Sequence, residues 1–172
     1  MCGLVAMLLY PQERSPQQWQ AIWDNFTQNL LANQSRGAEA TGVAIASCLG
    51  PVIIEKQAQP ASLFIQDQAY QTLPRYLSSD TVLIMGHTRR PTQGTPNRND
   101  NNHPLQAGQV TGIHNGHIHN NETLFNQFNL PRYADVDSEV IFQLLNQVIQ
   151  PDSDRWKHQN LVSHIADTLQ YL

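Results

Sequence analysis

The chain begins with Met1-Cys2-Gly3, and an uninterrupted apolar segment, residues 4–9, follows directly and stops before Pro11. A continuous apolar run of this length predicts a strand that is buried on both faces. If Met1 is removed, Cys2 carries a thiol and a free α-amine that titrates near pH ~8 and can accept the proton of the thiol. The first residues therefore predict a core strand that begins beside a candidate nucleophile. The alternative is an unreactive cysteine that only packs against its neighbours.

The length of 172 residues fits one domain, which we expect to cover residues 1–172. A net charge of −4 without a Lys/Arg cluster argues against nucleic acid and membrane surfaces as partners. No apolar run reaches the length of a membrane span, and no basic segment precedes residues 4–9 as in a signal peptide. The two cysteines lie in different contexts, which predicts no disulfide framework and a cytoplasmic location. Cys48, at the end of an apolar segment, is expected in the core.

The pattern of apolar residues predicts an α+β protein of layered sheets and helices. Strands are expected at residues 4–9, 42–48, 52–57, 81–86 and 110–114, the last turning at Asn115-Gly116 into residues 117–119. Ser15-Pro16 is typical of an N-cap followed by proline at the first helical position, and opens an amphipathic helix that ends near Gly37. Shorter helices are expected within residues 60–77 and after Asn121. Asp137-Ser138 opens another helix, and a last one carries apolar residues from Leu161 to Leu172.

Several polar residues at strand and helix ends are candidates for a site. Asn115 and Gly116 offer a side-chain amide and an unobstructed backbone N–H, which is the chemistry of an oxyanion hole, although Asn-Gly is also a common hairpin turn. Arg89, with Thr92, could bind a carboxylate through its planar guanidinium, or lie on the surface. Asp137 could receive an ammonium group, or simply cap a helix.

A metal site is a further hypothesis, because His114, His117 and His119 lie close together in the sequence and His103 is nearby. No carboxylate or cysteine completes a familiar ligand spacing around them. We therefore expect neither a metal nor another cofactor.

Six segments of the chain together match, in order and spacing, one known family. They are residues 1–4 (MCGL), 35–43 (SRGAEATGV), 86–94 (GHTRRPTQG), 103–104 (HP), 114–118 (HNGHI) and 137–140 (DSEV). In these segments the sequence resembles the glutaminase domain of class II glutamine amidotransferases, which are N-terminal-nucleophile hydrolases. Arg90 stands where this family often has an aromatic residue, and Gln93 where it often has histidine.

The resemblance implies a four-layer αββα fold and hydrolysis of the glutamine side-chain amide to glutamate and ammonia. It implies that Cys2 forms a thioester with its own α-amine as base, and that Asn115 and Gly116 form the oxyanion hole. Arg89 and Thr92 would hold the α-carboxylate of glutamine, and Asp137 its α-ammonium group. The resemblance gives supporting roles to Arg36, Gly37 and His103.

Domains of this family continue beyond the point that corresponds to Leu172, so the resemblance also implies a domain that is truncated at its C-terminus. The expected partners are L-glutamine and a synthase domain or partner chain that receives ammonia; an oligomer is left open. Another amide substrate is less expected, because Arg89 and Asp137 suit the two ends of a free amino acid. The remaining alternative is a truncated relative that binds glutamine or a partner chain without turnover.

Overall fold

Strand β4 (Thr81–Arg89) lies inside a four-stranded antiparallel sheet in the computed structural model, which describes residues 1–149 and 166–170. Strand β1 (Gly3–Leu8) pairs with one side of β4 and β2 (Ala40–Ser47) with the other, and β3 (Ile53–Gln57) pairs with β2. These strands confirm four of the predicted segments. Strand β4 is three residues longer than expected because Thr88 and Arg89 still pair with β2.

Helix α1 (Pro16–Asn33) begins where the sequence predicts it. The Ser15 hydroxyl accepts a hydrogen bond from the backbone N–H of Gln18, and the Gln18 side chain accepts one from the N–H of Ser15. This reciprocal capping box satisfies two N–H groups that the helix itself leaves free. A 3-10 turn, Gln34–Arg36, extends the helix to Gly37, as predicted.

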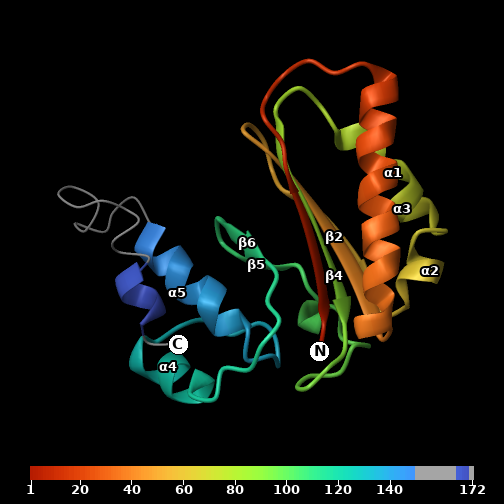
Figure 1. Cartoon of the computed structure of the whole chain (residues 1–172). Coiled ribbons are helices and arrows are strands. Elements are labelled where there is room, and N and C mark those ends of the chain that lie inside the picture. The colour runs from red at the N-terminus through yellow and green to blue at the C-terminus, as the bar shows by residue number, and fades with distance from the viewer. Residues whose placement is uncertain (150–165, 171–172) are drawn as a thin grey trace.

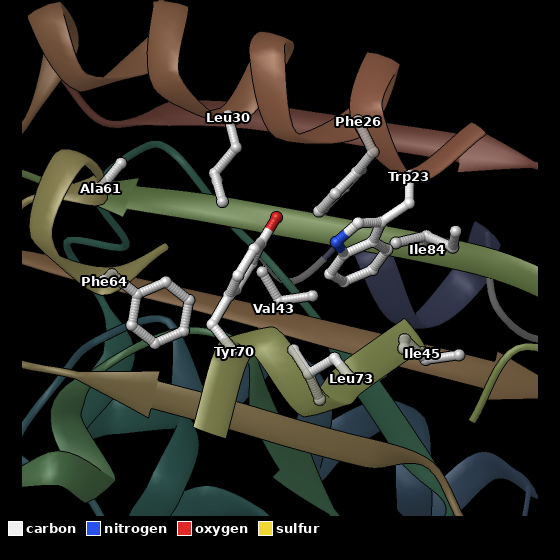
Figure 2. Packing of buried hydrophobic residues seen from close by; sticks show 10 residues of the cluster. All are labelled: Trp23, Phe26, Leu30, Val43, Ile45, Ala61, Phe64, Tyr70, Leu73 and Ile84. Atoms are coloured by element: carbon white, nitrogen blue, oxygen red, sulfur yellow. The ribbon is translucent and has the colours of Figure 1, made fainter. Parts of the chain in front are cut away.

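One face of the sheet is covered by α1 and by the short helices α2 (Ala61–Phe64) and α3 (Gln68–Thr72), with a 3-10 turn at Leu73–Tyr76 (Figure 1). Apolar side chains from α1 point toward the sheet and meet those of the short helices (Figure 2). The buried members of this cluster are Trp23, Phe26, Leu30, Val43, Ile45, Ala61, Phe64, Tyr70, Leu73 and Ile84. This cluster is the main core.

A second group of elements lies on the side of the sheet opposite α1 (Figure 1). It contains the hairpin of β5 (Leu105–Ala107) and β6 (Val110–Gly112), helix α4 (Asn121–Gln127), and helix α5 (Glu139–Ile149), which packs on the hairpin. Val140 and Leu144 of α5 and Leu124 of α4 are buried in the core of this group. The described residues thus form a mixed α/β domain.

Two predictions about burial are wrong. Strand β1 is an edge strand, and the side chains of Leu4 and Leu8 are exposed, Leu8 at 85 %. Only the face with Val5 and Met7 packs against the main core, because α1 covers one face of the sheet. Cys48 is exposed in the turn that follows β2, so it is not a core residue.

The predicted turn at Asn115-Gly116 is also wrong, because residues 113–119 contain no strand. Strand β6 pairs instead with β5, a strand that the sequence pattern did not reveal, around a turn at Gly108 with φ of 55°. Of the predicted last helix, residues 166–169 are helical, and residues 161–165 and 171–172 lie outside the described residues. Across the described part of the chain, no helix combines the length and apolar character needed to cross a membrane.

Phe26 is fully buried between α1 and the sheet, so Phe26→Ala should leave a cavity in the main core. We expect it to lower the free energy of unfolding by about 3–5 kcal/mol, measured by urea denaturation. Gln28→Ala, at an exposed position of the same helix, should change it by less than about 0.5 kcal/mol. Similar losses in the two variants would contradict this description of the core.

Candidate active site

The pairing of β1 with β4 places Gly3 opposite Thr88 and therefore brings Cys2 next to Arg89 and Arg90. A cavity of about 290 Å³ opens at this end of the sheet. Its lining contains seven of the residues predicted from the sequence: Cys2, Arg89, Thr92, His103, Asn115, Gly116 and Asp137. The two other predicted residues lie outside the lining. Arg36 contacts Cys2, and Gly37 lies against Arg89 at the end of β4.

Cys2 is held from three directions. Its backbone N–H donates to Oδ1 of Asn115 at 3.1 Å, and its carbonyl oxygen accepts from Nε of Arg36 at 3.0 Å. Its Sγ accepts from the backbone N–H of Arg90 at 3.3 Å and lies 3.5 Å from the Arg90 carbonyl oxygen, to which it donates. Because Met1 is present, the nitrogen of Cys2 is a peptide nitrogen here.

Two glycines allow the close approach of neighbouring groups. A Cβ on Gly37 would lie 2.4 Å from the backbone carbon of Arg89 and would clash with it. Glycine, which has no Cβ, therefore allows the end of β4 to lie against this position. A Cβ on Gly116 would lie 2.5 Å from Nε2 of His114. The ring of His114 therefore packs directly against the backbone of the Asn115-Gly116 pair.

Arg89 is buried, not a surface residue, at 3 % exposure. Its guanidinium donates to Oδ1 of Asn102 at 2.8 Å and to the carbonyl oxygens of Gln93 and Gly94 at 2.6 and 2.9 Å. Burial lowers the pKa of Arg89, whereas nearby Cys2 and Asp137 act in the opposite direction. An arginine keeps its positive charge under these conditions, so the cavity contains a fixed cation.

Sequence reasoning missed the residues that hold Arg89 in place. Asn101 and Asn102 lie in the loop after β4, and both are fully buried. Nδ2 of Asn102 donates to the carbonyl oxygen of Pro96, and Nδ2 of Asn101 to that of Thr95. Nζ of Lys56, on β3, donates to the carbonyl oxygens of Asn102 and Pro104. The abundance of asparagine in this segment was the only available signal, and it does not distinguish a buried loop from a solvated one.

Asp137 is also buried, and its carboxylate is satisfied by other parts of the chain. Oδ2 accepts from the backbone N–H of Ile118 at 2.6 Å and lies 3.1 Å from Nδ1 of His117, and Oδ1 accepts from the N–H of Ser138 at 2.9 Å. Helix α5 begins two residues later, at Glu139. Asp137 therefore joins the segment after Gly116 to the start of α5.

Two histidines of the cavity lining, His103 and His114, contact a third histidine, His87. His87 and His103 are buried and stacked, with ring centroids 4.5 Å apart. Nε2 of His87 lies 3.2 Å from the carbonyl oxygen of His114, and Nδ1 of His114 lies 2.9 Å from Oγ of Ser138. A carbonyl oxygen can only accept, so Nε2 of His87 carries the proton and the neutral ring holds the residue before Asn115.

Burial lowers the pKa values of all three of these histidines, that of His87 to about 4. The charges of neighbouring groups only modify this effect: Arg89 lowers the pKa of His87 further, and Asp137 raises that of His114. Among the described residues, no three His, Cys, Asp or Glu side chains are arranged to hold a metal ion. His117 and His119 contact each other, with ring centroids 4.4 Å apart, and His117 contacts Asp137.

Burial of the neutral His87 ring should make the free energy of unfolding depend on pH. Its pKa in the folded protein lies below that of an exposed histidine, so the unfolded chain binds more protons between the two values. Above pH ~6.5 the ring of His87 is neutral in both states and does not change the free energy of unfolding. As the pH falls toward ~4, protonation of His87 in the unfolded chain should lower the free energy of unfolding by up to about 3 kcal/mol. The amide of His87→Gln can donate to His114 without titrating. In urea denaturation, the free energy of unfolding of this variant should therefore fall less between pH ~6.5 and ~4 than that of the unmodified protein. Parallel curves for the two proteins would contradict the prediction.

Comparison with known proteins gives the chain a set of relatives. No family profile matches it. It is 29 % identical over 154 residues to glutamine--fructose-6-phosphate aminotransferase (isomerizing) of Staphylococcus epidermidis, and 28 % identical over 153 residues to the protein of the same name from Staphylococcus aureus. The matches cover 85 % and 84 % of this chain and 22 % of each relative, so the chain spans about a fifth of their length. These relatives confirm the resemblance to class II glutamine amidotransferases that the ordered sequence motifs predict.

Proposed function

We propose that the chain hydrolyses the side-chain amide of L-glutamine, with Cys2 as the nucleophile once Met1 has been removed. The observation that carries the proposal is the cavity of about 290 Å³, in which a thiol, an amide, a guanidinium and a carboxylate from four separate segments face a common space. The similarity to glutamine-dependent aminotransferases supports glutamine as the substrate.

In the proposed reaction, Sγ of Cys2 attacks the amide carbon of glutamine, and the thiol proton passes to the α-amine of Cys2. The amine then delivers a proton to the leaving nitrogen, so ammonia departs and a γ-glutamyl thioester remains. Water, activated by the same amine, attacks the thioester and releases glutamate and the free thiol. Removal of Met1 converts a peptide nitrogen that already contacts Asn115 into the required base.

Asn115 and Gly116 are proposed to stabilise the oxyanion. Because the backbone nitrogen of Cys2 is a donor, the contact at 3.1 Å must use Oδ1 of Asn115 as acceptor. The Nδ2 end of the same amide has no hydrogen-bond partner among the described residues and would donate to a developing negative charge beside Cys2. The backbone N–H of Gly116, in the lining of the same cavity, would be the second donor.

Arg89 and Asp137 are proposed to bind the two charged ends of the substrate. Three of the five N–H groups of Arg89 are donated to the loop, and the other two have no protein partner among the described residues. These two, with the exposed hydroxyl of Thr92, would take the α-carboxylate. Asp137 would take the α-ammonium group. Arg36, Gly37 and His103 would support the site, as their positions behind Cys2, Arg89 and His87 allow.

Three further parts of the proposal concern the setting of the site. We infer a four-layer αββα arrangement, which agrees with a sheet that α1–α3 cover on one face and the β5–β6 hairpin with α5 on the other. We also propose a synthase domain or partner chain as the ammonia acceptor. The relatives are named for amino transfer to fructose 6-phosphate, but this chain matches only a fifth of them. A cytoplasmic location completes the proposal.

The nucleophile can be tested directly. Intact-mass measurement should show loss of Met1, and the processed protein should release glutamate and ammonia from L-glutamine. Cys2→Ala should reduce this activity to background, since no other thiol lies in the cavity lining. Cys48→Ala is the matched control, because its thiol is exposed at the β2–β3 turn, and it should retain full activity. Retained Met1 together with full activity would exclude the α-amine mechanism.

The oxyanion hole makes a separate prediction. Asn115→Ala removes one donor and should lower kcat by about 10²–10³ with a smaller change in KM. Asn97→Ala, at an exposed position in the preceding loop, should leave both constants unchanged. An effect of Asn115→Ala on KM alone would assign Asn115 to substrate binding instead.

A further inference from the structure

His117 differs from the other contacts of Asp137 because it can move. Oδ2 of Asp137 has two neighbours, the N–H of Ile118 at 2.6 Å and Nδ1 of His117 at 3.1 Å, while Oδ1 accepts from Ser138. The N–H groups of Ile118 and Ser138 belong to the backbone and are fixed by the fold. The side chain of His117 is 45 % exposed, whereas that of Asp137 is 4 % exposed. The ring can therefore rotate into solvent, but the carboxylate cannot.

We propose that the His117 ring occupies the position on Asp137 that the α-ammonium group of a substrate must take, so that each substrate molecule displaces His117 in order to bind. The inference rests on the proposed function, which assigns the ammonium group to Asp137. A carboxylate oxygen offers two lone-pair directions, and Oδ2 already uses both. Oδ1 accepts from the backbone N–H of Ser138 at 2.9 Å and from its hydroxyl at 3.5 Å. A new donor must therefore replace the ring, since the N–H of Ile118 cannot leave without unfolding the segment that follows Gly116.

The lining of the cavity offers an incoming ammonium group no alternative anion. Asp137 is the only carboxylate in the described lining of the cavity. An ammonium group that binds a carboxylate in this cavity must therefore compete with the His117 ring for Asp137.

The size of the effect follows from the exposure of the pair. The contact is exposed on the side of His117 and contributes little, so its removal should tighten binding of an ammonium-bearing substrate only about two- to five-fold. The change should appear in KM or in the dissociation constant and leave kcat nearly unaltered. His117 would thus reduce the preference for amino acids over amides that lack an amino group.

The test measures binding without turnover, in the Met1-processed Cys2→Ala protein. Calorimetric titration with L-glutamine at neutral pH should show about two- to five-fold tighter binding once His117→Ala is added. His119→Ala is the matched control, because it removes the neighbouring exposed imidazole and leaves the Asp137 contact in place. L-glutamine should also shift the ring ¹⁵N resonances of His117, and 4-carbamoylbutanoate, which lacks the amino group, should not.

The outcomes separate the two proposals. Glutamine binding that is equal in the His117→Ala and His119→Ala proteins overturns the role of His117 and leaves the proposed function standing. Absence of glutamine binding in every variant overturns the proposed function and the inference with it. A shift of the His117 resonances by glutamine alone, with the expected gain in His117→Ala, supports both.

Discussion

The register between β1 and β4 is the constraint on which the candidate site depends. Gly3 pairs with Thr88, so Cys2 lies beside the Arg90 backbone and its sulfur contacts that residue at 3.3 Å. A shift of one residue would turn every side chain of β1 to the opposite face of the sheet. Packing prevents this slip, because Val5 and Met7 face the main core and Leu4 and Leu8 face away from it. Packing of Val5 and Met7 in the main core therefore positions Cys2, which is not itself a core residue.

The remaining side of the cavity is held by buried polar contacts. Arg89 brings a cation into the interior, and the loop after β4 folds around it, with Asn102 and two carbonyl oxygens as acceptors. Removing one member of such a network leaves a buried charge or carbonyl unsatisfied, which costs more than the contact itself contributes. This dependence accounts for the burial of the two polar side chains Asn101 and Asn102. It also fixes the cation relative to Cys2 before any substrate arrives.

The two charged residues of the cavity differ in how much freedom their partners have. The partners of Arg89 are a buried amide and two backbone carbonyl oxygens, whereas Asp137 shares one oxygen with the exposed ring of His117. The cation is thus anchored by the fold, and the anion is partly covered by a side chain that is 45 % exposed. Under the proposed function, an amino acid would meet a rigid receptor for its carboxylate and an exchangeable one for its ammonium group.

The sequence by itself determined the strands β1 to β4, the capped start of α1, and the set of residues that gather at the cavity, because these follow from local periodicity, capping chemistry and ordered motifs. It could not reveal that β1 is an edge strand, that Cys48 is exposed, or that β6 pairs with β5. Burial and pairing depend on which distant segments meet, and no local pattern records this. The anchoring of Arg89 by Asn102 and of His117 by Asp137 likewise joins residues 13 and 20 positions apart. Only the tertiary structure decides such contacts, because they form when the loops that carry them close over the end of the sheet.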